Sequence, residues 1–181
     1  MGVLAKTPVT PSALTWLGFI LALGAAALVI TGYLFAAGFV VLLAGFFDIL
    51  DGALARRIEK ATPFGAVLDA TFDRLSEAVL LLAILAVYAI QQSTTGILLV
   101  GAALIGSQLV SYIRARAEAQ GLECRVGIFT RAERVVVLAL GLLLSHFAPA
   151  LLIALAIIVV FSFVAVGQRL VYVWRQRTLG S

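Results

Sequence analysis

Residues 47–74 read FDILDGALARRIEKATPFGAVLDATFDR, and this stretch sets four aspartates beside or inside segments apolar enough to lie in lipid. These are Asp48, Asp51, Asp69 and Asp73. Carboxylates at membrane depth are costly and normally mark an ion site or a reaction centre. Helical spacing puts the first two on one helix face with Gly52 and Ala55, and the last two on the next helix face with Gly65. The stretch therefore predicts two helix faces that close around one site.

The composition outside this stretch is that of an integral membrane protein. Of 181 residues, 63% are hydrophobic and only 12% are charged, and the mean hydropathy is +1.14. The apolar runs have roughly the 20 residues that a helix needs to cross the hydrocarbon core. Alternating strand patterns are absent, so the spanning elements are expected to be helices. No cleavable signal peptide is evident, and a single cysteine, Cys124, excludes an intrachain disulfide.

Six transmembrane helices in an all-α fold are predicted. Breaks at Thr31-Gly32, at Glu59 to Pro63 and at Gln91 to Gly96 separate the first four spans, and Gly121 is expected to end the fourth. Thr130 and Glu133 resemble a capping box that opens the fifth. The sixth is expected to end near Val173. We expect one membrane-embedded domain over residues 1–181, with a short lead at 1–10 and a polar tail at 174–181. Gly18 and Gly24 are expected at close helix contacts.

The charges predict the orientation of these spans. Turns at 31–33, 91–96 and 146–149 contain no Lys, Arg, Asp or Glu, so every charged residue falls at the opposite membrane face. Positive residues gather on the cytoplasmic side, which predicts that both termini are cytoplasmic and that the aspartate site opens toward the cytoplasm. The net charge of +4 is then explained by the inner leaflet rather than by nucleic acid. His146 falls in an outer turn, where a catalytic role is not expected.

The chemistry of the four aspartates favours Mg²⁺ or Mn²⁺. Carboxylates without nearby His or Cys make a hard oxygen site. Four like charges repel one another unless cations neutralise them, and a cluster of two ions would also hold a diphosphate. Gly52, Ala55 and Gly65 have a matching use, because a nucleotide base or phosphate approaches the backbone only where side chains are small.

Each feature alone has a plainer explanation. Glycines serve ordinary helix packing, and the aspartates alone would fit an interfacial ion-pair network with Arg56, Arg57 and Arg74. Together the features fit these explanations poorly, because four acids at these spacings exceed what interfacial solubility requires.

The stretch resembles the signature D-x2-D-G-x2-A-R-x8-G-x3-D-x3-D of the CDP-alcohol phosphotransferase family and reproduces it in full. The matching residues are Asp48, Asp51, Gly52, Ala55, Arg56, Gly65, Asp69 and Asp73. The resemblance implies a transferase that releases CMP. It also implies two metal ions on the four aspartates, with Asp73 in addition as the general base. Gly52, Ala55, Arg56 and Gly65 would line the nucleotide pocket.

Arginines later in the chain indicate the kind of alcohol that attacks. They stand at the ends of three spans on the face where the aspartates lie, and they are Arg114, Arg116, Arg131, Arg134 and Arg169. Guanidinium clusters suit phosphate, so a phosphorylated alcohol is expected, although topology alone would also place arginines there. SYIRARAE at 111–118 and RAER at 131–134 resemble the phosphatidylinositol phosphate synthases. That resemblance implies an acceptor-phosphate pocket of Arg114, Arg131 and Arg169, with Arg116 and Arg134 beside it.

These observations predict a transferase that moves a phosphatidyl group from CDP-diacylglycerol to inositol 1-phosphate. The alternatives are a phosphatidylglycerol phosphate synthase, another CDP-alcohol phosphotransferase and, from a different class, a cation or proton transporter. A purely structural membrane subunit would give no reason for four acids. The family resemblance also implies a homodimer, for which Gly101 and Gly106 are candidate contact residues. Relatives commonly carry an interfacial helix before the first span, whereas only about ten residues precede Pro11 here.

Overall fold

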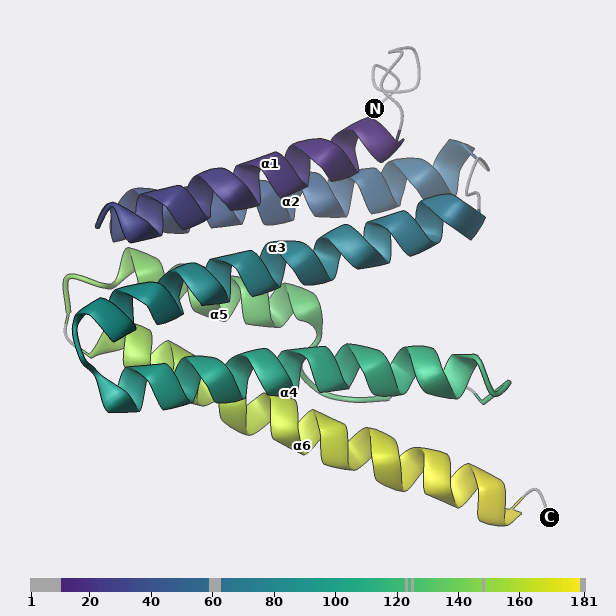
Figure 1. Ribbon diagram of the computed structural model, residues 1–181. Coiled ribbons are helices and arrows are strands. Elements are labelled where there is room, and N and C mark those ends of the chain that lie inside the picture. Colours follow the sequence, from purple (N-terminus) through teal and green to yellow (C-terminus); the bar gives the residue numbers. More distant parts are fainter. Residues whose placement is uncertain (1–10, 59–62, 123, 125, 148, 180–181) are drawn as a thin grey trace.

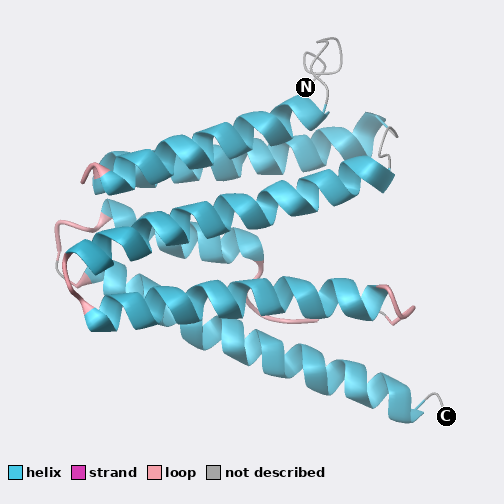
Figure 2. Ribbon diagram, in the orientation of Figure 1, coloured by secondary structure: helices cyan, strands magenta, loops and turns pink. Residues whose placement is uncertain are grey.

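The computed structural model describes residues 11–58, 63–122, 124, 126–147 and 149–179; for residues 11–12, 49–58, 63 and 177–179 only the backbone is described. The described chain forms helices joined by turns and loops (Figure 2). The helices are α1 (Pro11–Ile30), α2 (Leu34–Ile58), α3 (Pro63–Ile90), α4 (Thr94–Glu118), α5 (Arg131–Leu143) and α6 (Ala150–Leu179). The prediction of an all-α fold with six helices is confirmed.

Three helices of the described chain are long and apolar enough to cross a membrane. They comprise Ala13–Ile30, Thr94–Glu118 and Ala150–Gln176. Within α2 the apolar part is shorter, Leu34–Asp48, and α3 carries Asp69, Asp73 and Glu77 along its length. Charged side chains therefore break the apolar character of α2 and α3 where the site lies. α5 has only 13 residues, fewer than the roughly 20 that span the hydrocarbon core.

Most helix ends lie where the sequence predicted them. Gly32 and Gly121 have φ angles of +86° and +73°, a conformation that glycine adopts easily at a helix end. The backbone N–H of Thr130 donates to the Glu133 carboxylate, so the capping box at the start of α5 is confirmed. The sixth helix was expected to end near Val173, but α6 continues to Leu179, because the polar residues WRQR at 174–177 are compatible with a helix. Residues 1–10 lie outside the described part.

The helices run alternately back and forth along one bundle (Figure 1). Close packing joins α1 to α2 and α3, α4 to α3 and α6, and α5 to α2 and α6. Figure 1 shows the start of α1 and the end of α6 at the end of the bundle where α2 ends and α3 begins. The bundle thus brings the Asp48–Asp73 stretch and the connection between α4 and α5 to one end.

Glycines make close helix contacts at positions other than those predicted. A Cβ on Gly18 or Gly24 would meet no atom within 4 Å, so the expected contacts there are wrong. A Cβ on Gly38 would lie 2.7 Å from Leu143, and one on Gly141 would lie 2.5 Å from Ala154. Because such distances are too short for a side chain, these glycines let α5 approach α2 and α6 closely.

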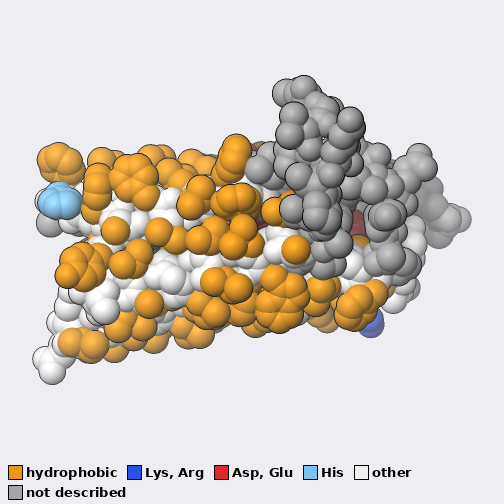
Figure 3. Space-filling model, turned by 90° about the horizontal axis from the view of Figure 1, so that it is seen from above, with side chains coloured by type: hydrophobic (Ala, Val, Ile, Leu, Met, Phe, Trp, Pro, Cys, Tyr) orange, Lys and Arg blue, Asp and Glu red, His pale blue; other side chains and the backbone are white. Residues whose placement is uncertain are grey.

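Charged and uncharged ends are also separated in space. In Figure 3 the single histidine lies at one end of the molecule, whereas the visible acidic and basic side chains lie toward the other end. His146 is exposed and its ring faces that of Phe35 at a centroid distance of 6.0 Å. That His146 has no catalytic role stays a prediction.

Candidate active site

Three of the four predicted aspartates meet at one place. Asp48 comes from α2, and Asp69 and Asp73 come from successive turns of α3. One carboxylate oxygen from each lies within 4.8 Å of the other two. The two helices are brought together by α1, which packs on both. The structure therefore assembles the carboxylate cluster that the spacing predicted.

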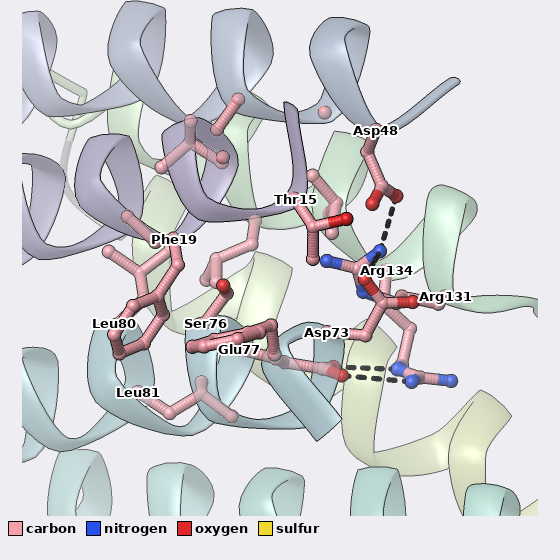
Figure 4. Close-up of a pocket in the computed structure, with 18 of the residues that line it drawn as sticks. Thr15, Phe19, Asp48, Asp73, Ser76, Glu77, Leu80, Leu81, Arg131 and Arg134 are labelled. Carbon is pink, nitrogen blue, oxygen red and sulfur yellow. Dashed lines mark hydrogen bonds and ion pairs between the residues drawn. The ribbon is translucent and has the colours of Figure 1, made fainter. Parts of the chain in front are cut away.

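The side chain of Arg131 completes this cluster. Its Nη1 donates to Asp48 Oδ2 and lies 2.8 Å from Asp73 Oδ1. Arg131 is the first residue of α5, so the capping box that starts α5 also places this guanidinium at the carboxylates (Figure 4). Three carboxylates face one guanidinium group, which leaves the cluster with an excess of negative charge.

The cluster fits a divalent metal. Among the described residues, Asp69 Oδ1 is buried and has no hydrogen-bond partner, as expected of a ligand atom that an ion would satisfy. The donors are carboxylate oxygens, which suit Mg²⁺ or Mn²⁺. The guanidinium of Arg131 takes the place of a cation between Asp48 and Asp73. The plainer explanation was an ion-pair network with Arg56, Arg57 and Arg74. Among the described side chains Arg74 does not pair with these aspartates and instead donates to the carbonyl of Ala70 at 3.1 Å, while the side chains of Arg56 and Arg57 lie outside the described residues.

A cavity of about 760 Å³, its open mouth included, extends from the cluster into the bundle. Its polar end holds Asp48, Asp73, Glu77, Arg131 and Arg134, and Figure 4 shows these side chains together. The other lining residues are mostly apolar and come from α1, α2, α3, α5 and α6. Charged groups at one end and apolar walls beyond them are what a substrate with a phosphate headgroup and a lipid body requires.

The predicted nucleotide side is described only in part. Gly65 lies half-buried in the first turn of α3. Asp51, Gly52, Ala55 and Arg56 belong to the last turns of α2, but their side chains lie outside the described residues.

The predicted acceptor arginines occupy different environments. Arg114 is half-exposed and pairs with Glu118 at 2.9 Å, and Arg116 is exposed in the same turn of α4. Arg169 is buried and donates to the carbonyl of Val126 at 3.1 Å and to that of Val110. Only Arg131 among the five lies at the carboxylates.

Arg134 lies deeper than the others and is paired with a residue that the sequence analysis did not single out. Its Nε and Nη2 lie 2.7 and 2.9 Å from Glu77 Oε1 and Oε2. The hydroxyl of Ser107 donates to the same carboxylate. Glu77 follows Asp73 by four residues in an apolar helix, and a carboxylate in such a helix is the same sequence signal that marked the aspartates.

Known proteins match this chain in sequence and in fold. The family model for CDP-alcohol phosphatidyltransferase matches residues 8–167. Archaetidylinositol phosphate synthase of Methanothermobacter thermautotrophicus is 39% identical over 168 residues, which cover 90% of this chain and 82% of that protein.

Two crystal structures of phosphatidylinositol phosphate synthase from Mycobacterium tuberculosis have the same fold. The one with CDP-DAG bound has a TM-score of 0.85 and 36% identity, and the match covers 94% of this chain and 89% of that one. The one in complex with manganese and citrate has a TM-score of 0.85 and 37% identity, over 94% of this chain and 85% of that one. The chain is thus an integral membrane protein that belongs to the CDP-alcohol phosphatidyltransferase family, and it is an enzyme similar to the phosphatidylinositol and archaetidylinositol phosphate synthases.

Proposed function

We propose that this enzyme transfers the phosphatidyl group of CDP-diacylglycerol to a hydroxyl of inositol 1-phosphate and releases CMP. The observation that carries the proposal is the contact of Arg131 with Asp48 and Asp73. A phosphate bound by this arginine would lie beside the carboxylates, so an acceptor with a phosphate would bring its hydroxyl close to the reaction centre. The names of the similar synthases support inositol phosphate as the acceptor.

Four aspartates would hold two divalent ions in this proposal. Asp48, Asp69 and Asp73 are the candidate ligands whose side chains are described, and Asp51 is assigned by the family signature. When bound, such ions neutralise the diphosphate and stabilise the charge on departing CMP. The manganese in the similar synthase supports this metal class.

Side chains of the protein would carry out proton transfer and substrate binding. Asp73 takes the proton from the attacking hydroxyl, whose oxygen forms a bond to the phosphorus that bears the diacylglycerol. The bond between this phosphorus and the CMP oxygen breaks, and CMP leaves with the electron pair. Gly52, Ala55, Arg56 and Gly65 are assigned to the nucleotide, and the apolar cavity walls are assigned to the lipid part of the substrate.

We propose that five arginines contribute to the binding of the phosphorylated acceptor in different ways: Arg114, Arg116, Arg131, Arg134 and Arg169. Arg131 binds the acceptor phosphate at the carboxylates, and Arg114 and Arg116 lie exposed at the end of α4, where they are accessible to it. Arg169 holds the segment before α5 through the Val126 carbonyl. Arg134 is engaged by Glu77.

Orientation and assembly remain proposals. The charge-free turns at 31–33 and 91–96 support a site that faces the cytoplasm. A homodimer is proposed from the family resemblance; a Cβ on Gly101 would meet no atom within 4 Å, whereas one on Gly106 would lie 3.0 Å from Ser162 of the same chain. Gly101 is therefore the better candidate for a contact between subunits.

A panel of acceptors tests the proposal. The purified enzyme receives CDP-diacylglycerol, Mn²⁺ and one of inositol 1-phosphate, free inositol or glycerol 3-phosphate, and CMP is measured. Release with glycerol 3-phosphate alone would favour a phosphatidylglycerol phosphate synthase. No release with any acceptor would contradict the transfer reaction.

A further inference from the structure

A buried polar cluster lies beneath the carboxylates at the point where α3, α4 and α5 meet. Glu77 accepts two hydrogen bonds from Arg134, at 2.7 and 2.9 Å, and a third from the Ser107 hydroxyl. The Arg134 and Glu77 side chains are only 2% and 7% exposed. Figure 4 shows the two bonds between Glu77 and Arg134, and the three donors described on this carboxylate are all groups of the protein itself.

The spacing of residues along α3 and α5 places this ion pair next to a second one, Asp73 with Arg131, at the mouth of the site. Glu77 follows Asp73 by four residues on α3, and Arg134 follows Arg131 by three on α5. Residues at these spacings share a helix face. The outer pair, Asp73 with Arg131, has side chains that are each 26% exposed, and the inner pair, Glu77 with Arg134, is buried. The outer pair is therefore more accessible to ligands than the inner pair, which lies deeper in the cavity.

The two ion pairs connect α3 and α5 where these helices do not pack closely on each other. α3 packs on α1 and α4, and α5 packs on α2 and α6; across the described chain, α3 and α5 are not among the closely packed pairs. The cavity between them is lined by Asp73 and Glu77 on one side and by Arg131 and Arg134 on the other. The spacing of α3 and α5 at the site therefore depends on side-chain contacts across the cavity.

We propose that Glu77 and Arg134 are positioning residues: their ion pair sets the register of α5 against α3 and so holds the Arg131 guanidinium at the metal carboxylates. The proposal rests on the proposed function in assigning the acceptor phosphate to Arg131. Stability alone does not require this pair, because apolar residues of similar volume often replace a buried ion pair without loss of stability. A bidentate guanidinium–carboxylate pair does fix distance and orientation, which apolar packing does not.

The test replaces the inner pair by apolar residues and separates folding from positioning. The double variant Glu77→Leu/Arg134→Met is compared with the unaltered enzyme in detergent by thermal unfolding, by calorimetric titration with Mn²⁺ and by acceptor kinetics. We expect it to remain folded and to bind Mn²⁺ severalfold more tightly in the absence of substrates, because Arg131 no longer competes for the carboxylates. We also expect the acceptor KM to rise about tenfold or more.

Controls and further variants keep the test decisive. Leu142→Ala removes a fully buried side chain of α5 away from the cavity and should lower thermal stability without changing Mn²⁺ affinity or acceptor KM. If the double variant does not fold, Glu77→Asp and Arg134→Lys keep both charges and alter only the geometry of the pair. Each should shift Mn²⁺ affinity and acceptor KM in the same directions.

The Mn²⁺ titration separates this proposal from the transfer reaction. Unchanged Mn²⁺ affinity in a folded variant of the inner pair would overturn the positioning role, whether or not CMP is released. A shifted Mn²⁺ affinity in an enzyme that releases no CMP would support the positioning role and contradict the transfer reaction.

Discussion

Arg131 Nη1 lies 2.8 Å from Asp73 Oδ1 and also donates to Asp48, so one guanidinium joins the two helices that carry the carboxylate cluster. This contact joins two groups of residues for which different ligands were predicted from the sequence. The aspartates were predicted to bind metal and the arginine to bind acceptor phosphate. Their contact indicates that the two halves of the site share one polar surface.

Removing the Arg131 charge should strengthen metal binding. In Arg131→Gln, no guanidinium competes for Asp48 and Asp73, and the repulsion between carboxylates is relieved only by the added ion. We expect Mn²⁺ to bind severalfold more tightly in a calorimetric titration without substrates, while the acceptor KM rises. Weaker Mn²⁺ binding would mean that Arg131 supports the metal site instead of competing with it.

Asp73→Asn should abolish most turnover and leave CDP-lipid binding largely intact. Loss of a general base typically lowers a rate by about 10² to 10⁴-fold. Single-turnover CMP release measures the rate, and equilibrium binding of CDP-diacylglycerol measures the ground state. As a comparison, Asp48→Asn should chiefly weaken metal binding. A near-normal rate in Asp73→Asn would exclude the general-base role.

Chelation should inactivate the enzyme, and Mn²⁺ should restore it with two ions bound per chain. The three described carboxylates and Asp51 supply enough oxygens for such a pair. Titration of the chelated enzyme, followed by electron paramagnetic resonance, counts the bound ions and detects coupling between them. One bound ion per chain at saturation would contradict the two-ion site.

Arg169→Ala should raise the acceptor KM with a smaller effect on kcat. Arg169 holds the Val126 carbonyl, and the segment that it holds leads into Arg131. Arg175→Ala is the matched control, because Arg175 is an exposed arginine later on the same helix and is expected to serve topology. Steady-state kinetics with varied acceptor concentration compare the two variants. If both change the acceptor KM equally, Arg169 has no specific role in acceptor binding and serves topology as Arg175 does.

Breaking the inner ion pair on one side should strongly destabilise the protein. Glu77→Ala leaves the buried Arg134 guanidinium without its carboxylate, and breaking a buried ion pair in this way costs about 3–5 kcal/mol. Thermal unfolding in detergent should therefore shift strongly downward. Ser107→Ala, which keeps the ion pair and removes one hydrogen bond, should shift it much less.

Local sequence signals were sufficient to predict most of the fold. Gly32, Gly121 and the Thr130–Glu133 capping box end or begin helices for reasons contained in a few neighbouring residues. The meeting of Asp48 with Asp69 and Asp73 followed from helical spacing and from the density of carboxylates in an apolar stretch. The single-domain assignment over residues 1–181 stays a prediction.

Contacts between distant helices were less accessible from the sequence. Gly18 and Gly24 were expected at close contacts, but Gly38 and Gly141 make them, because a glycine's partner depends on how the helices are arranged. The pairing of Glu77 with Arg134 joins residues 57 positions apart and depends on α5 beginning beside the cavity. The sequence contained both residues without indicating that they meet.

The most direct test of the proposed function compares two acceptors that differ by one phosphate. The enzyme in lipid vesicles with CDP-diacylglycerol and Mn²⁺ receives radiolabelled inositol 1-phosphate or radiolabelled free inositol, and the label that enters lipid is measured together with CMP. We expect inositol 1-phosphate to be incorporated with equimolar CMP and free inositol not to be incorporated. Incorporation of free inositol at an equal or higher rate would contradict an acceptor site built on Arg131 and a phosphate.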